Sequence, residues 1–225
     1  YNAVCVISDL STNKAGTITS GLDRFMEWKT KDGDYENTAY AQFDTFYEGM
    51  FQKARLLDIL KNFILFSGDG QKPIKILAGY HQYFAVRKAI EKAKIATKTD
   101  GKGGVFWHTQ GSGKTITMIM LTKMITRESM KPESQIREPR FIMVTDRVNL
   151  DKQIRDNFIH TQMSPHRAKT GKGLIELLQD NSNTVITALV NKFEAAVKQE
   201  YCNDSKNLFL FIDEGHRTQY GKLNL

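Results

Sequence analysis

Short apolar runs alternate with longer ones over the last two thirds of the chain, from about residue 73 to residue 225. The short runs "VFWH", "RFIMVTD", "TVITAL" and "LFLFIDE" have the length and composition of strands. The longer runs "TITMIMLTKMI", "VNLDKQIRDNF" and "GLIELLQD" predict helices. Strands that alternate with helices predict an α/β fold, in which helices cover both faces of a parallel sheet. Right-handed crossovers then bring the carboxyl ends of all strands to one edge.

Polar motifs follow three of these predicted strands. They are "HTQGSGKT" at residues 108–115, "TDR" at residues 145–147 and "DEGH" from residue 213. Ligands of open parallel sheets bind at the carboxyl edge, so this edge is the expected functional site.

The motif "HTQGSGKT" has the features of a phosphate-binding loop: a predicted strand enters, glycines follow, and a helix leaves with Lys-Thr in its first turn. Backbone N–H groups there form an anion site, aided by the helix N-terminus. Lys114 supplies a charge for the β- and γ-phosphates, and Thr115 supplies a hydroxyl to Mg²⁺. The candidate nucleotide-binding residues are Gln110, Gly111, Ser112, Gly113, Lys114 and Thr115.

The full pattern G-x-x-x-x-G-K-[ST] has a glycine where this chain has His108. That glycine relaxes the exit from the strand, whereas the later residues hold the phosphate, so we expect the loop to bind a nucleotide. The alternative is a chance glycine-rich helix start.

An acidic pair ends the apolar run "LFLFIDE". Asp213 is the candidate Mg²⁺ ligand, through water, and Glu214 is the candidate base that activates the attacking water. Together with Lys114 they are the predicted catalytic residues. The alternative is an acidic pair that begins a surface turn.

Charge and cysteine content limit the partners and the compartment. The net charge of +7 and the pI of about 9.3 favour a polyanionic partner such as nucleic acid, although a basic, unspecialised surface would give the same values. Cys5 and Cys202 lie beside apolar residues and form no C-x-x-C pair, which predicts buried thiols in a reducing, cytoplasmic environment. No apolar run of membrane-spanning length and no signal peptide is visible.

The first 72 residues differ in texture from the rest. "AVCVISD" predicts a buried strand, and the turn-rich stretch after it completes a region of residues 1–41 that resembles the end of a domain. Apolar residues then recur at helical spacing up to about residue 66, which predicts one continuous packing helix with Asp44 as its N-cap.

The motifs "HTQGSGKT", "VTDRVNLDKQI" and "IDEGHR" resemble motifs I, Ia and II of superfamily 2 helicase-type ATPases. With "AGYHQYFAVRKAI", "DRFMEWKT" and "RLLDILKNFILF", the whole chain resembles the R (restriction and motor) subunit of type I restriction-modification enzymes. The resemblance implies three regions: the end of a PD-(D/E)xK nuclease domain (1–41), a helical connector (42–72) and an incomplete first RecA-like motor domain with a P-loop NTPase sheet (73–225).

The same resemblance implies an ATP-dependent DNA translocase coupled to endonuclease cleavage. Its cofactors would be ATP and Mg²⁺, and its partners double-stranded DNA and the methylation and specificity subunits. The nuclease carboxylates and the second motor domain, with its arginine finger, are not in this sequence, so slow ATP hydrolysis is expected. The alternatives are a stand-alone superfamily 2 helicase or remodeller without a nuclease, and a catalytically inactive nucleic-acid-binding module.

Further site residues are implied by resemblance. Gln82 would bind the adenine edge, because its amide both donates and accepts. Thr145 and Arg147 in motif Ia, and Asn191 and Lys192 after "TVITAL", would contact the DNA backbone. The basic stretch "SPHRAKTGKG" brings Arg167, Lys169 and Lys172 together in a predicted loop, which is either a further DNA contact or, as the favoured alternative, a solvated connection.

Overall fold

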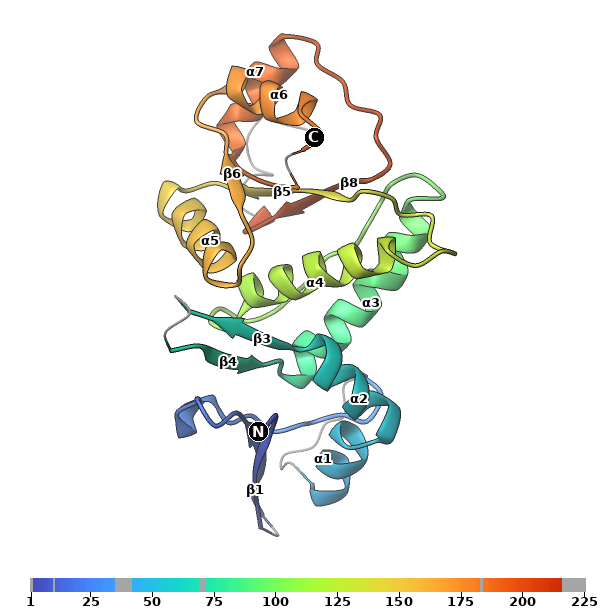
Figure 1. Cartoon of the computed structure of the whole chain (residues 1–225), viewed down its shortest axis with the longest axis vertical. Helices are drawn as coiled ribbons and strands as arrows, with labels where there is room; N and C mark the ends of the chain where they lie inside the picture. Colours follow the sequence, from blue (N-terminus) through green and yellow to red (C-terminus); the bar gives the residue numbers. More distant parts are fainter. Residues whose placement is uncertain (1, 10, 35–41, 69–71, 183, 216–225) are drawn as a thin grey trace. The chain divides into compact units, whose positions relative to one another are not determined.

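The computed structural model describes residues 2–9, 11–34, 42–68, 72–182 and 184–215 (Figure 1). The chain divides into two compact units. Unit 1 comprises Tyr1–Lys92 and Gly103–Leu121, and unit 2 comprises Ala93–Lys102 and Thr122–Leu225. The division passes through two long helices, α3 (Tyr80–Ala96) and α4 (Lys114–Ser129).

Unit 2 contains a parallel sheet of four strands. Their order is β6-β7-β5-β8, with bounds Pro165–Arg167, Val185–Leu189, Arg140–Thr145 and Leu208–Ile212. All neighbours pair in parallel. Every residue of β5 is buried, as expected for an inner strand covered on both faces. The prediction of a parallel α/β sheet is therefore confirmed.

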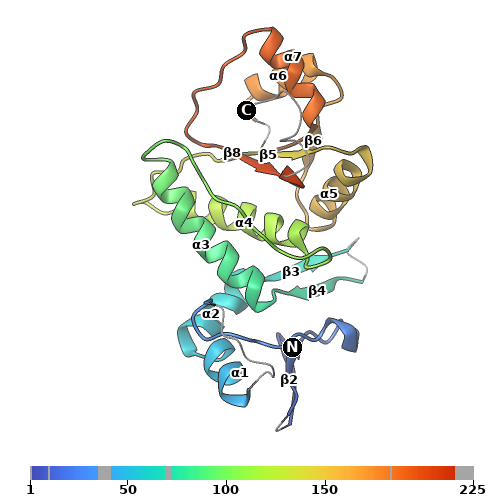
Figure 2. The same cartoon turned by 180° about the vertical axis from the view of Figure 1, so that it is seen from behind.

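Helices cover both faces of this sheet, as Figures 1 and 2 show. Helices α6 (Gly171–Gln179) and α7 (Phe193–Lys198) lie on one face, and α5 (Val148–His160) lies on the other. The short 3-10 helix η2 (Val190–Lys192) directly precedes α7. The core under α6 is made of apolar side chains from both layers, namely Ile142, Val144, Leu174, Leu178, Ile186 and Ala188.

Unit 1 is built from two hairpins and several helices. Strands β1 (Cys5–Ser8) and β2 (Asn13–Gly16) pair antiparallel, as do β3 (Ile64–Ser67) and β4 (Ile74–Leu77). A 3-10 helix η1 (Leu22–Arg24) and helices α1 (Phe43–Met50) and α2 (Lys53–Asn62) lie between the hairpins in sequence. No helix among the described residues is long and apolar enough to cross a membrane.

The prediction of a single helix up to residue 66 is wrong. Two helices form instead, and Phe51 and Gln52 lie between them. Gln52 is the N-cap of α2, because its side-chain oxygen accepts the Arg55 N–H at 3.0 Å. Gln42, not Asp44, occupies the N-cap of α1. Residues from Ile64 leave the helix because they pair with β4. Helical spacing did not reveal these interruptions, since two short helices and an amphipathic strand preserve similar apolar positions.

The predicted strand "VFWH" is also absent. Residues 101–109 have no regular structure, and Val105 and Trp107 are 90% and 92% exposed. A strand needs a neighbour to accept its backbone hydrogen bonds, and the described sheets pair no strand with this segment.

Burial differs from expectation at three other places. Strand β1 forms, but Val6 and Ile7 are exposed on its two-stranded hairpin. Cys5 is only partly buried, and Cys202 is exposed in a loop beside Asp204. Arg167 belongs to strand β6 rather than a solvated connection, and its guanidinium lies 2.7 Å from the buried carboxylate of Asp151.

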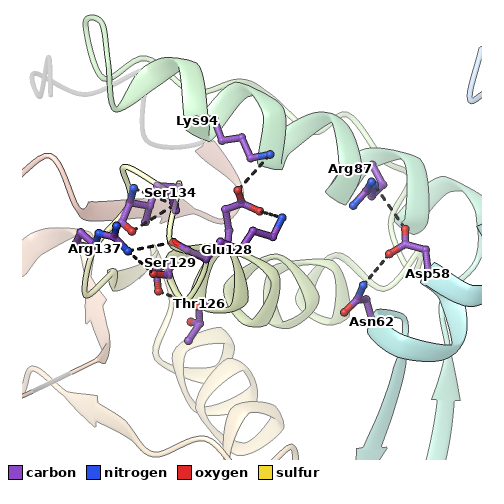
Figure 3. Close-up of polar contacts among 11 residues, drawn as sticks. Asp58, Asn62, Arg87, Lys94, Thr126, Glu128, Ser129, Ser134 and Arg137 are labelled. Atoms are coloured by element: carbon purple, nitrogen blue, oxygen red, sulfur yellow. Dashed lines mark hydrogen bonds and ion pairs between the residues drawn. The ribbon is translucent and has the colours of Figure 1, made fainter.

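Two arginines satisfy carbonyls at helix C-termini in unit 2. The buried Arg140 donates to the carbonyls of Leu177, Leu178 and Asp180 and to the Asn181 side chain, at 2.7–3.0 Å, at the end of α6. The exposed Arg137 donates to carbonyls at and just beyond the end of α4, including that of Ser129 at 3.2 Å (Figure 3). Both side chains supply donors to carbonyls that lack a partner at a helix C-terminus, but Arg140 does so in the interior and Arg137 at the surface.

Replacing Arg140 should therefore cost more stability than replacing Arg137. We expect Arg140→Ala to lower the free energy of unfolding by about 2–4 kcal/mol, because buried carbonyls lose their donors. Arg137→Ala should cost about 1 kcal/mol or less, since water can replace its bonds. Urea unfolding followed by circular dichroism measures both, and equal losses would contradict the assignment.

Asp58 links α2 to α3 in unit 1. Its carboxylate accepts a hydrogen bond from the Tyr83 hydroxyl at 2.9 Å. It also accepts one from the Asn62 amide at 2.7 Å, and Arg87 lies 3.5 Å away (Figure 3). Burial, then the hydrogen bond and negative charge of Asp58, raise the pKa of Tyr83 to about 12.

This raised pKa makes stability depend on alkaline pH. The unfolded phenol ionises near its ordinary pKa of 10.0, whereas the folded phenol keeps its proton up to about 12. The contribution is complete below pH 10 and is lost as the pH rises towards 12. Urea unfolding from pH 9 to pH 12 should show the stability advantage of the native chain over Tyr83→Phe shrinking. In Asp58→Asn the effect should be smaller, and a pH-independent difference would contradict this account.

Candidate functional site

The glycine-rich loop of unit 1 ends directly in helix α4, whose first residues are Lys114 and Thr115. Gly111 and Gly113 have φ angles of 81° and 80°, values that other residues rarely adopt. The Lys114 ammonium donates to the His108 carbonyl at 3.3 Å, so the lysine closes over the loop. The predicted order of glycines, lysine and helix start is confirmed, although no strand enters.

Gly113 is required for a second reason. A Cβ atom built on it would lie 2.6 Å from the side-chain nitrogen of Gln82. By contrast, nothing lies within 4 Å of a Cβ at Gly111, so the loop has open space on that side. Gly113 therefore permits a close approach of α3 to the loop, whereas Gly111 serves the turn.

Gln82 joins the start of α3 to this loop and is 5% exposed. Its oxygen accepts the Gly79 N–H at 3.0 Å, the return bond of a capping box. Its nitrogen donates to the carbonyls of Ser112 and Gly113, both at 3.2 Å. The neighbouring His81 Nε2 lies 3.1 Å from the same Ser112 carbonyl. Adenine binding by Gln82 stays a prediction, because this amide is here occupied by protein partners.

His108, at the position of the usual first glycine, stands beside His81 with 5.3 Å between ring centroids. Burial, followed by the charges of His81 and Lys114, lowers the pKa of His108. The neutral ring adds no charge to the loop at pH 7. Within the described part of the chain, the buried His108 Nδ1 and Ser112 Oγ have no hydrogen-bond partner.

The acidic pair lies in unit 2, immediately after β8. The Asp213 N–H donates to the Val144 carbonyl at 2.9 Å, so the residue continues the parallel pairing. Its side chain is largely buried and accepts the Glu214 N–H at 3.0 Å. Glu214 has a φ of 53°, a left-handed conformation that is uncommon for glutamate. The rest of the motif, from His216, lies outside the described residues.

The predicted DNA contacts lie at the same carboxyl edge as Asp213. Thr145 and Arg147 follow β5, and Asn191 and Lys192 follow β7, which is parallel to it. Arg147 is exposed and Asn191 is exposed, whereas Thr145 is 2% exposed and its hydroxyl lies 3.4 Å from the Arg147 carbonyl. Their role in DNA binding stays a prediction.

The structure thus brings the candidate residues together in two groups. Gln82 and the loop residues 110–115 form one group in unit 1, and the residues after β5, β7 and β8 form the other in unit 2. Contact of Lys114 and Asp213 with one nucleotide is accordingly a proposal. Sequence reasoning missed His81, although a glycine followed three residues later by Gln82 is compatible with a helix start that places His81 on the first turn of α3.

Known proteins resemble the chain in the region that carries this site. A family described as SWI2/SNF2 ATPase matches residues 81–225. The type I restriction enzyme HindI endonuclease subunit of Haemophilus influenzae is 33% identical over 98% of this chain. A protein of Methanocaldococcus jannaschii with the provisional name type I restriction enzyme MjaIXP endonuclease subunit is 29% identical over 99% of this chain.

The chain spans only 22% and 23% of the length of these two relatives. The similarity nevertheless extends along nearly all of the chain, and the family match includes both the glycine loop and the acidic pair. The chain therefore belongs to the SWI2/SNF2 ATPase family and is a homologue of the endonuclease (R) subunits of type I restriction enzymes.

Proposed function

We propose that this chain carries the ATP-binding part of a DNA translocase within a type I restriction endonuclease subunit. The observation that carries the proposal is the glycine turn that closes on Lys114 at the first residue of α4. Such a turn presents backbone N–H groups, a helix N-terminus and an ammonium to one anion. The family match and the names of the relatives support an ATP-driven, DNA-directed reaction.

Each site residue has a role in this proposal. Residues 110–113 contribute N–H groups to the phosphates, and Lys114 neutralises charge that develops on the transferred phosphoryl group. Glu214 orients and deprotonates the attacking water. Gln82 would recognise adenine once it exchanges its present partners.

The residues also fit Mg²⁺, which prefers oxygen ligands and is usually held by one or two protein groups together with phosphates. The Thr115 hydroxyl and the Asp213 carboxylate are such ligands. When bound, Mg²⁺ would neutralise phosphate charge, and these two side chains would hold it in place. The open space beside Gly111 leaves room for the phosphates.

Unit 2 is proposed to hold the DNA backbone. Arg147, Asn191 and Lys192 offer donors at the carboxyl edge, and contacts limited to phosphates suit a motor that moves over any sequence. We further propose that residues 1–41 end a nuclease domain, residues 42–72 connect it and residues 73–225 begin a RecA-like motor. Methylation and specificity subunits would be its partners.

Nucleotide binding by the chain tests the proposal directly. In calorimetric titration with Mg·ATP, Lys114→Ala should weaken binding by about 10- to 100-fold, because a charge-assisted contact is lost. Lys98→Ala, which removes an exposed lysine outside the loop, is the matched control and should bind as the native chain does. Equal affinities for all three proteins would favour an inactive module instead.

DNA binding makes a separate prediction. Arg147→Ala should weaken binding to duplex oligonucleotides of any sequence and reduce the slope of log K against log salt by about 1. Arg24→Ala serves as the control, because Arg24 is an exposed residue of η1 whose side chain forms an ion pair with the adjacent Asp23. Fluorescence anisotropy at several salt concentrations gives the slopes, and an unchanged slope for Arg147→Ala would remove this residue from the interface.

A further inference from the structure

The first turn of α3 presents two different surfaces to two parts of unit 1. Tyr80, Tyr83 and Phe84 are spaced i, i+3 and i+4 and therefore share one stripe of the helix. All three rings contact the indole of Trp28, with centroid separations of 6.4, 5.7 and 5.9 Å. Trp28 is 2% exposed and belongs to the segment that follows the first hairpin.

Trp28 is also tightly packed against α1. A Cβ atom on Gly49 of α1 would lie 2.4 Å from the indole. A Cβ on Gly33 would lie 2.6 Å from the ring of Phe84. Two glycines therefore let the N-terminal segment and α1 pack tightly against one indole and one turn of helix.

His81 and Gln82 lie off the aromatic stripe and hold the glycine loop. His81 Nε2 and Gln82 Nε2 both contact the Ser112 carbonyl, and Gln82 Nε2 also donates to the Gly113 carbonyl. A peptide unit is planar and trans, so its N–H points opposite to its C=O. Holding the carbonyls of Ser112 and Gly113 therefore aims the N–H groups of Gly113 and Lys114 away from α3.

We propose that His81, together with Gln82, is a positioning residue for the phosphate-binding N–H groups, and that the turn Tyr80–Phe84 couples this loop to Trp28. The inference rests on the proposed nucleotide binding but goes beyond it, since it names a second region that senses the bound state. A phosphate that draws the two N–H groups towards itself rotates their peptide planes. The carbonyls then pull on a helical turn that is stacked on Trp28.

Coupling of this kind is reciprocal: if nucleotide binding shifts the packing equilibrium around Trp28, a change in that packing must shift nucleotide affinity. The chain has two tryptophans, Trp28 and the 92%-exposed Trp107. A Trp107→Phe background therefore makes Trp28 the only tryptophan in the 225-residue chain.

The test follows Trp28 emission in that background during titration with Mg·ADP, while calorimetry measures binding independently. We expect a saturable change in emission whose midpoint agrees with the calorimetric dissociation constant. His81→Ala should weaken binding by about 5-fold and diminish the emission change, whereas His81→Gln, which retains a donor, should largely restore both. Trp28→Phe should weaken binding by a similar factor, while Trp107→Phe alone should not.

The outcomes separate the two proposals. Calorimetric binding without any change in Trp28 emission overturns the coupling and leaves nucleotide binding in place. An affinity that is unaffected by His81→Ala overturns the positioning role. Absence of calorimetric binding by a folded chain overturns both proposals at once. Circular dichroism of each variant verifies folding, and Trp28→Phe is used because it keeps an aromatic ring in the core.

Discussion

Parallel pairing on both sides of β5 is the constraint on which unit 2 depends. The register places Thr145 opposite Leu189 of β7 and Val144 opposite Ile212 of β8, so the three strands end at nearly the same level. The polar residues that follow each of the three strands therefore lie at one edge of the sheet. A one-residue slip of β5 would turn each of its buried side chains to the opposite layer and disrupt the packing on both faces. The acidic turn and the basic residues share an edge for this reason.

Most elements of unit 2 were predictable because they are specified by their own residues, whereas β6 and α7 were not predicted. β5, β7 and β8 are short apolar runs, and α4, α5 and α6 carry apolar residues at helical spacing. Predictions failed where the outcome depended on distant partners. Nothing within "VFWH" reveals whether another strand accepts its hydrogen bonds, and nothing near residue 64 shows that β4 will pair with it. The exposure of Val6 and Ile7 on β1 and of Cys202 could likewise not be predicted, because local sequence does not show which elements pack beside them.

The candidate site likewise has a part that local sequence predicts and a part that depends on distant partners. The loop from Gly111 to Thr115 is a local structure, so its glycines and its place at the start of α4 could be predicted. The contacts of His81 and Gln82 with Ser112 span 30 or more residues and depend on how α3 packs. The sequence marked Gln82 by resemblance, but only the structure shows that its amide caps α3 and holds the loop.

These contacts determine what adenine recognition by Gln82 would cost. Releasing its nitrogen would not leave either loop carbonyl without a donor, because Ser112 keeps His81 and Gly113 keeps the Thr117 N–H at 3.0 Å. Only the Gly79 N–H, which donates to the Gln82 oxygen, would need a new partner. An unsatisfied buried group costs about 1–3 kcal/mol, so the exchange is limited to one such penalty. His81 thus allows Gln82 to act as a clamp at one stage and as a base-recognising residue at another.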